Sequence, residues 1–292
     1  MSPLAGRGMR TSIECIACFV RQAAEAVGLV VEDRRREELL RLLLKEIAAC
    51  DWRGSPPVVG QVIHRIIRRE LGVDDPYRAL KRHLNDKAEE LVPVIRETLG
   101  RRSDREAALL RVAAAGNLLD AGAKSGIAPQ DLHGVLQRLW RLPFRGDARD
   151  FFRRTAQARS ILYLADNAGE IFFDRLLVEE LPRDRVTVAV RGAPTLNDAT
   201  LEDARRAGLT GLVRVIANGS DAPGTVLADC SAEFREEFER AELIISKGQG
   251  NFETLSEEDG RIYFLFTVKC EVVGRKVGAA VGTLLCVPGG GG

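Results

Sequence analysis

Long hydrophobic runs are absent from this sequence of 292 residues. No apolar stretch approaches the roughly 20 residues that a membrane-spanning helix needs. The opening segment MSPLAGRGMR also lacks the apolar core of a secretory signal peptide. From these absences we expect a cytoplasmic protein that does not act at a membrane.

An excess of charge of either sign is also missing, because 43 basic residues nearly balance 42 acidic ones. This balance gives no electrostatic indication of nucleic-acid binding. Six cysteines are too few for a disulfide scaffold in a chain of this length, so we expect mostly free thiols. A hydrophobic content of 45% is enough for a sizeable core in one large domain or two modest ones.

Helical periodicity dominates the first half of the chain. From Ser12 to about Arg141 the apolar residues recur at the spacing of one helix face, and we find no β-rich segment among them. Helix starts are indicated at Asp33, Pro56-Pro57, Asp75-Pro76, Ser103-Asp104 and Pro129. We expect Pro93 to disturb the helix that begins near Pro76. Residues 1–150 are therefore predicted to form an all-helical domain.

The pattern changes near Pro143, where short apolar runs rich in β-branched residues begin to alternate with segments of helical period. The runs cover residues 161–165, 186–190, 213–217, 243–246 and 262–268. Strand and helix in alternation indicate a parallel sheet that is covered on both faces. Residues 151–292 are therefore predicted to form an α/β domain of the doubly wound type.

Polar residues follow the predicted strands, and the carboxyl ends of parallel strands share the edge where ligands bind. The candidates at this edge are Asp166, Asn167, Glu170, Arg191, Asp198, Lys247, Gly248, Gln249, Gly250, Asn251 and Lys269. Turns from strand to helix are usually polar, so one such turn alone carries little information. As a set, they combine carboxylates and amides suited to a hard cation with lysines and backbone amides suited to a phosphate.

The scarcity of histidine narrows the choice of metal ion. All three histidines fall in the helical half, so a cation at the strand edge would be bound through oxygen, which favours magnesium or manganese. The best ligands are Asp166, Asn167 and Asp198, whereas Glu170 is either part of the site or a simple first-turn acid that suits the helix dipole. Lysine is scarce too, at 7 residues against 36 arginines, yet Lys247 and Lys269 both follow strands. A point-charge donor for a phosphate is a plausible reason.

Several familiar phosphate chemistries lack their motifs in this chain. The sequence has no GxxxxGK[ST] loop of a P-loop NTPase, and its first strand-to-helix turn has no GxGxxG dinucleotide fingerprint. Neither Cys230 nor Cys270 has arginine six positions later, which excludes the cysteine phosphatase loop. The first turn reads DNAGE instead of a DxD pair, so the common aspartyl-phosphate pattern fails as well.

The helical half contains two further polar pairs. Asn117 and Asp120 share one face of an otherwise apolar helix, and they either face the cleft or bond to a neighbouring helix. Cys15 and Cys18 form a CxxC pair without a second CxxC to complete a zinc site. Their thiols are either core residues or a redox pair with a regulatory role.

Four motifs then point to a known family. The stretches YLADNAGE, VRGAPTLNDATLEDA, SKGQGNFETL and FTVKC, in this order, resemble those of the metal-dependent damage-control phosphatases, formerly domain-of-unknown-function family eighty-nine. Upstream, ECIACFVRQA, DPYRALKRHLN and AGNLLDAG resemble the microbial branch with paired cysteines. The likeness extends from about Cys15 to Cys270. One departure is Thr267, where the family often has a basic or small residue.

The resemblance implies a helical domain packed on a Rossmann-like, three-layer α/β domain with one divalent metal ion at its carboxyl edge. The ion would be manganese or magnesium, with cobalt or nickel also possible. The implied metal ligands are Asp166, Asn167 and Asp198. The implied phosphate-binding residues are Lys247 and Lys269, with Gly248, Gln249, Gly250 and Asn251 nearby, and we add Arg191, Asn117 and Asp120 as further candidates for substrate contact.

We expect hydrolysis of a small phosphomonoester, such as a sugar phosphate, in metabolite damage control. Asp166, Asp198 and Lys247 would be catalytic, and Glu170 could orient the attacking water. The alternatives are an S-adenosylmethionine-dependent carboxyl methyltransferase in the same cleft, or a redox or sugar-phosphate binding module that uses Cys15 and Cys18. The sequence leaves open the substrate, the physiological metal, water or a carboxylate as nucleophile, and the oligomeric state.

Overall fold

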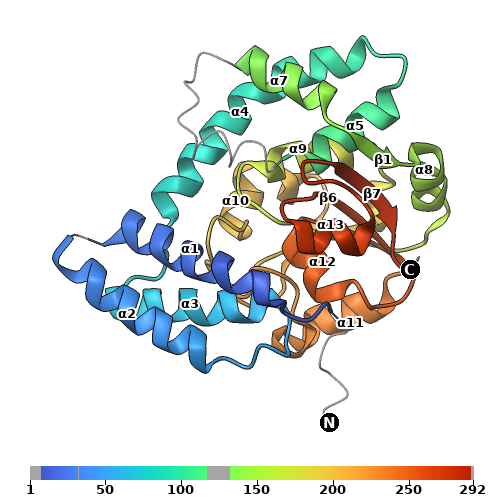
Figure 1. Cartoon of the computed structure of the whole chain (residues 1–292). Coiled ribbons are helices and arrows are strands. Elements are labelled where there is room, and N and C mark those ends of the chain that lie inside the picture. The colour runs from blue at the N-terminus through green and yellow to red at the C-terminus, as the bar shows by residue number, and fades with distance from the viewer. Residues whose placement is uncertain (1–7, 32, 117–131, 291–292) are drawn as a thin grey trace.

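The computed structural model (Figure 1) describes residues 8–31, 33–116 and 132–290. The strands are β1 (Phe144–Gly146), β2 (Ile161–Leu164), β3 (Val186–Val190), β4 (Arg214–Ala217), β5 (Leu243–Lys247), β6 (Ile262–Thr267) and β7 (Leu284–Pro288). The helices before the first strand are α1 (Ile13–Val30), α2 (Asp33–Ala49), α3 (Pro56–Leu71), α4 (Arg78–Gly100), α5 (Arg105–Ala114) and α7 (Leu132–Arg141). The helices after it are α8 (Ala148–Gln157), α9 (Glu170–Val178), α10 (Leu201–Arg206), α11 (Ala232–Arg240), α12 (Gln249–Leu255) and α13 (Glu271–Val277).

In the described part of the chain, seven strands form one sheet in the order β1-β7-β6-β5-β2-β3-β4. All neighbouring strands are parallel except β6 and β7, which are antiparallel. Leu162 of β2 pairs with Thr187 of β3 on one side and with Ile244 of β5 on the other. The chain therefore leaves β2 in one direction through β3 and β4 and then returns to the other side with β5. A crevice is expected at the carboxyl ends of β2 and β5, where this reversal occurs.

The predicted α/β fold with a mostly parallel sheet is confirmed, and all five predicted strands are present. The sequence did not indicate β1 and β7, which pair with each other. The strand β1 has only three residues, too few for a recognisable alternation. It also lies before residue 151, so the sheet begins earlier than the predicted start of the α/β domain.

Side chains of each central strand enter two different hydrophobic cores, because successive residues of a strand point to opposite faces. Ile245 packs on one face with Tyr163 and with residues of α4, α5 and α9. Ile244 packs on the other face with Phe264 and with residues of α11 and α13. The helices α1, α2 and α3 share a third core of their own. The helices α4 and α5 thus belong to the sheet's core, and the division of the chain at residue 150 stays a prediction.

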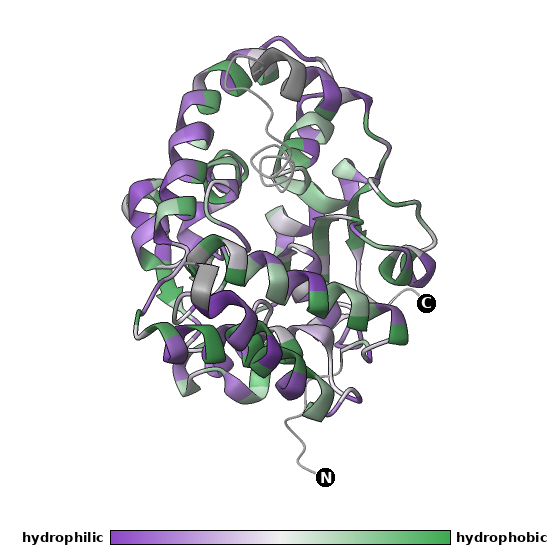
Figure 2. Ribbon diagram, turned by 60° about the vertical axis from the view of Figure 1, so that its left-hand side comes forward, coloured by the Kyte–Doolittle hydropathy of each residue, from purple (hydrophilic) through white to green (hydrophobic). Residues whose placement is uncertain are grey.

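The three helices α1, α2 and α3 lie beside one another at one end of the molecule (Figure 1). Figure 2 shows that helices alternate hydrophilic and hydrophobic residues along their length, as expected for helices with one packed face. Arginines of α3 attach this group to the sheet: Arg65 Nε donates to Asp221 Oδ2 at 2.9 Å, and Arg68 pairs with the same carboxylate. Asp221 follows β4, so these ion pairs hold the group at the carboxyl edge of the sheet.

The helix α4 corrects one prediction, because it continues through Pro93 to Gly100. Proline in a helix interior removes a backbone hydrogen bond and costs about 3 kcal/mol. Leu91, Ile95 and Leu99 around it are all buried in the core shared with the sheet, and this packing offsets the cost. No helix among the described residues is long and apolar enough to cross a membrane.

Candidate functional site

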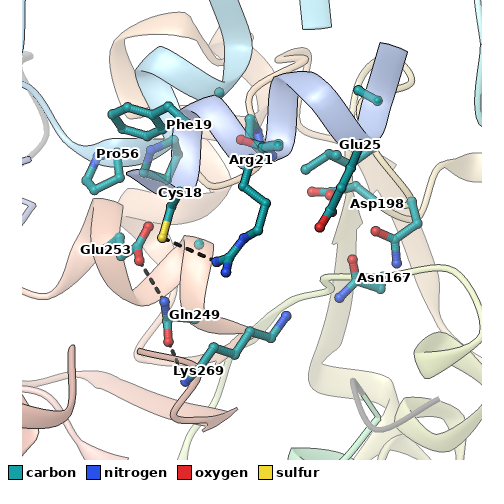
Figure 3. Close-up of a pocket in the computed structure, with 18 of the residues that line it drawn as sticks. Cys18, Phe19, Arg21, Glu25, Pro56, Asn167, Asp198, Gln249, Glu253 and Lys269 are labelled. Carbon is teal, nitrogen blue, oxygen red and sulfur yellow. Dashed lines mark hydrogen bonds between the residues drawn. The ribbon is translucent and has the colours of Figure 1, made fainter. Parts of the chain in front are cut away.

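A cleft of about 620 Å³ lies between the carboxyl edge of the sheet and the helix α1. The predicted site residues that line it are Asp166, Asn167, Asp198, Gln249, Gly250 and Lys269. Figure 3 shows Asn167, Asp198, Gln249 and Lys269 on the sheet side, with Cys18 and Arg21 extending from α1 above them. The structure therefore brings together the ends of β2, β5 and β6 and the turn after β3, as the sequence predicted.

The three predicted metal ligands are held by backbone contacts between two turns. The turn after β2 and the turn after β3 form an isolated bridge between Asn167 and Asp198. The backbone N–H of Ala199 donates to the carbonyl of Asp166 at 2.8 Å, and that of Ala168 donates to the carbonyl of Asn197 at 2.8 Å. These bonds fix the relative position of side chains that are 32 residues apart in the sequence (166 and 198).

The orientation of the Asn167 amide is set by two carboxylates. Its Nδ2 donates to Asp166 Oδ2 at 2.7 Å and to Glu170 Oε2 at 3.3 Å. With the amide nitrogen committed to these acceptors, the carbonyl Oδ1 must face another direction. Asn167 can therefore present an oxygen to a cation while its nitrogen donates to two neighbouring carboxyl groups.

Arg191 is buried and lies against the candidate ligands. Its Nε donates to Asp198 Oδ2 at 2.6 Å, and its terminal nitrogen NH2 is 3.6 Å from Asp166 Oδ1. The same nitrogen donates to Asn251 Oδ1 at 3.2 Å, while Asn251 Nδ2 donates to the carbonyl of Lys247 at 2.7 Å. Arg191 and Asn251 thus connect the turns after β2, β3 and β5, and neither side chain is among those that line the cleft. Their predicted contact with phosphate stays a prediction.

Lys247 is fully buried, with a relative exposure of 0%. Its ammonium forms ion pairs with Glu170 and, at 2.5 Å, with Asp174 Oδ1. Asp174 also accepts a hydrogen bond of 2.8 Å from the hydroxyl of Tyr163. Lys247 is not among the residues that line the cleft, and its predicted contact with phosphate stays a prediction. Asp174 was missed from the sequence, although its place four residues after Glu170 puts both acids on one face of α9.

This edge of the sheet holds more buried negative than positive groups. One cluster of buried charged side chains is joined through Arg191 and Lys247, and it contains Asp166, Glu170, Asp174, Asp198, Arg191 and Lys247. Four carboxylates against two cations leave two negative charges in excess when all groups are ionised. Burial away from water is the main cause that raises the pKa of Glu170 to about 8 and the pKa of Asp198 to about 7, although Lys247 and Arg191 act to lower them.

A divalent cation would balance this excess of charge. Asp166 and Asp198 line the cleft, and Asn167 lies between them in the network of bonds. Within the described residues, no three His, Cys, Asp or Glu side chains form a cluster that could bind a metal ion, so a site here depends on the amide oxygen of Asn167. Two carboxylates and one amide are the kind of donor set that hard cations prefer. The residues present therefore fit a magnesium or manganese ion.

Two glycines are required by close packing around these carboxylates. Gly248 has φ +81°, and a Cβ there would lie 2.0 Å from Asp166 Oδ2. A Cβ at Gly116 would lie 2.2 Å from Glu170 Cγ. The backbone amide of Gly248 donates to the carbonyl of Leu265 at 3.0 Å, so the role of this glycine is to let the chain pass the carboxylate. Asn117 and Asp120, which follow Gly116 in the sequence, lie outside the described residues.

The turns after β5 and β6 are joined through side chains of the cleft wall. Gln249 Oε1 accepts a hydrogen bond of 2.8 Å from the backbone N–H of Lys269, and its Nε2 donates to Glu253 Oε1 at 2.8 Å. Burial raises the pKa of Glu253 to about 7. Lys269 itself is exposed and lines the cleft. Of the predicted lysines, Lys269 is the one whose charge faces the cleft.

The helix α1 forms the opposite wall, which the sequence did not predict. Cys15 and Cys18 line the cleft, together with Cys270 from the end of β6. All six cysteines lie in described parts of the chain and are free thiols. The expectation of free thiols is confirmed, whereas the regulatory role of the pair stays a prediction. The signal that was available is the helical spacing of the two cysteines beside charged residues of α1.

Comparison with known proteins gives a consistent result. Residues 11–285 match the model of the damage-control phosphatase ARMT1-like domain. The damage-control phosphatase PH1575 of Pyrococcus horikoshii is 36% identical over 289 residues, which cover 96% of this chain and 98% of that protein. A damage-control phosphatase of Archaeoglobus fulgidus is 32% identical over 288 residues, with 95% and 98% covered.

Solved structures include a near neighbour of the whole fold. The crystal structure of a DUF89 family protein from Pyrococcus horikoshii, at 2.04 Å resolution, has a TM-score of 0.87 and 33% sequence identity to this chain. The match covers 96% of this chain and 99% of that one. The predicted family is thereby confirmed over the first helices as well as the sheet. The chain belongs to the family of the damage-control phosphatase ARMT1-like domain.

Proposed function

We propose that the protein is a metal-dependent phosphatase that hydrolyses small phosphomonoesters, such as sugar phosphates, in metabolite damage control. The observation that carries the proposal is the meeting of Asp166, Asn167 and Asp198 in a cleft at the point where the sheet reverses. The names of the relatives from Pyrococcus horikoshii and Archaeoglobus fulgidus support the phosphatase activity.

In this proposal Asp166, Asn167 and Asp198 hold one divalent ion, manganese or magnesium, with cobalt or nickel as substitutes. Such an ion supplies Lewis-acid activation of a phosphoryl oxygen and of a water. Arg191 keeps Asp198 in place through its hydrogen bond of 2.6 Å. It also offsets part of the negative charge that remains when the cleft receives a phosphate.

Lys269 binds the phosphate of the substrate, since its side chain lines the cleft beside the candidate metal ligands. Gln249 holds the backbone of Lys269 by a hydrogen bond of 2.8 Å, and so positions that lysine. Gly250 lines the same wall, where a Cβ would lie 2.2 Å from the carbonyl oxygen of Pro223, so the glycine allows these two chain segments to pass closely. These residues bind and orient the ester so that its charged oxygens are neutralised as the bond to the leaving group breaks.

Glu170 acts through Asn167 in this scheme. It accepts a hydrogen bond from the amide nitrogen at 3.3 Å and is itself paired with the buried Lys247. The pair fixes which atom of the amide faces the cleft. In this proposal Lys247 acts as a positioning residue, whereas the sequence predicted a phosphate contact for it.

The test is a phosphatase screen over sugar phosphates and nucleotides with magnesium, manganese, cobalt and nickel. We expect turnover of at least one ester with one of these ions, and its loss on chelation. The variant Asp166→Ala should lower kcat/KM by roughly a thousandfold, which corresponds to about 4 kcal/mol. The exposed Asp184 lies just before the amino end of β3, at the edge of the sheet opposite the cleft, and provides the control Asp184→Ala, which should retain full activity.

Full turnover by Asp166→Ala at saturating manganese would refute the site. Turnover that is unaffected by chelation would refute the metal dependence.

A further inference from the structure

The cleft has a second basic side chain, on the wall opposite the sheet. Residues of α1 that line the cleft recur at helical spacing: Cys15, Cys18, Gln22, Glu25 and Leu29. One face of α1 therefore forms this wall. Arg21 belongs to the same wall, and Figure 3 shows its side chain extending from α1 toward the sheet side of the cleft.

Arg21 has an unusual partner for an arginine of this protein. Its terminal nitrogen NH2 donates to the Sγ of Cys18 at 3.5 Å, and a thiol is only a weak acceptor. Among the described residues, no carboxylate forms an ion pair with Arg21, although Glu25 lies four positions later on the same helix. By contrast, the exposed Arg41 of α2 forms two hydrogen bonds with Glu37, at 3.0 and 2.8 Å.

The dimensions of the cleft leave space for more than a phosphate group. A volume of about 620 Å³ is within the range of pockets that enclose whole small molecules. Lys269 and Asp198 lie on the sheet side of the cleft, whereas Arg21 extends from the α1 wall. The two basic groups come from different elements, so they are able to contact two different groups of one bound molecule.

We propose that Arg21 binds a second anionic group of the substrate, separate from the phosphate that is hydrolysed. The guanidinium matches the paired oxygens of a carboxylate or a phosphate, with two parallel N–H donors. The preferred substrates are therefore phosphomonoesters that carry a further carboxylate or phosphate. This inference rests on the proposed function for the placement of the hydrolysed phosphate at the sheet edge.

The test compares two sugar derivatives that differ in one anionic group. Glucose 6-phosphate carries the phosphate alone, and 6-phosphogluconate adds a carboxylate at the other end. Loss of a charge-assisted hydrogen bond costs about 1.5–3 kcal/mol, which is roughly a tenfold to hundredfold change. In Arg21→Gln, the ratio of kcat/KM for 6-phosphogluconate to that for glucose 6-phosphate should fall by this factor. Arg21→Lys should retain part of the preference.

The matched control is Arg41→Gln, which removes an exposed arginine of α2 that does not line the cleft. It should leave the ratio unchanged. A parallel measurement with glucose 1,6-bisphosphate shows whether the second group is a phosphate or a carboxylate. The compound whose kcat/KM falls more in Arg21→Gln, the bisphosphate or 6-phosphogluconate, carries the preferred group. An unchanged ratio, or an equal loss on all three esters, would overturn the proposal.

Failure of the proposed function can be told apart from failure of this inference. If the wild-type protein hydrolyses none of the three esters, calorimetry with 6-phosphogluconate and glucose 6-phosphate in the presence of manganese replaces the kinetics. Tighter binding of 6-phosphogluconate that is lost in Arg21→Gln would support the second anion site without the phosphatase activity. Equal binding of the two compounds, or binding of neither, would overturn it.

Discussion

Replacement of Lys247 by methionine is predicted to destabilise the fold strongly, even though the residue lies behind the cleft. Its ammonium is the shared cation of Glu170 and Asp174, and all three side chains are at most 1% exposed. Removing one partner of a buried ion pair costs about 3–5 kcal/mol, because the remaining charge has no compensation in the interior. With a typical stability of about 5–15 kcal/mol, Lys247→Met would lose a large part of the total.

Urea unfolding followed by circular dichroism measures this loss as a shift of the midpoint at unchanged slope. Lys269→Met is the matched control, because that side chain is exposed, and it should change the stability by less than about 0.5 kcal/mol. Lys247→Met leaves the carboxylates of Glu170 and Asp174 without their cation. Adding Asp174→Asn removes one of these two charges, so the double variant should lose less free energy of unfolding than the sum of the losses in the two single variants.

The reasoning would be refuted if Lys247→Met were as stable as Lys269→Met. Strict additivity of Lys247→Met and Asp174→Asn would also contradict it, because it would mean that the two groups do not interact.

Two further variants test individual side chains. Gly248→Ala should weaken manganese binding by at least roughly tenfold, because the new Cβ would meet Asp166 Oδ2 at 2.0 Å. The control is Gly278→Ala: this glycine also has a positive φ, but its Cβ would find its nearest contact at 3.8 Å, so the change should lower stability without affecting metal binding. Equal metal binding in the two variants would contradict the prediction. His64 is buried against the Tyr77 hydroxyl at 2.9 Å, and burial lowers its pKa from 6.5 to about 3. As the pH falls, this histidine therefore takes up a proton in the unfolded chain before it does so in the folded protein. Its titration lowers the free energy of unfolding by about 2 kcal/mol between pH 6.5 and pH 5. Because buried carboxylates titrate as well, the measurement is the difference in urea stability between wild type and His64→Gln at the two pH values, and a difference that does not change with pH would contradict the assignment.

The sheet and the edge residues were predictable because both depend on local patterns. β-branched runs alternating with helical segments indicate parallel strands, and parallel strands place Asp166 and Asp198 at one edge regardless of strand order. The glycine at position 248 follows from the same logic, since turns often need it, but its contact with Asp166 does not. That contact joins chain segments 82 residues apart (166 and 248), and no spacing rule predicts it.

The parts that the sequence did not predict depend on tertiary packing. Lys247 was predicted to bind phosphate because it follows a strand in a sequence poor in lysine, and that prediction does not include the ion pair that Asp174 of α9 forms with it in the interior. The helix α4 passes Pro93 because its packing offsets a local cost. The wall formed by α1 depends on ion pairs such as that of Arg68 with Asp221, over 100 residues away in the sequence (68 and 221). Local periodicity identifies α1 as a helix, but not what it covers.

The central claim is that Asp166, Asn167 and Asp198 hold one divalent ion. Isothermal titration calorimetry of the metal-free protein with manganese tests it without reference to any substrate. The account predicts one ion bound per chain in the wild type, no measurable binding in Asp166→Ala, and wild-type binding in the surface variant Asp184→Ala. Absence of binding in the wild type at millimolar manganese, or unchanged stoichiometry and affinity in Asp166→Ala, would contradict it.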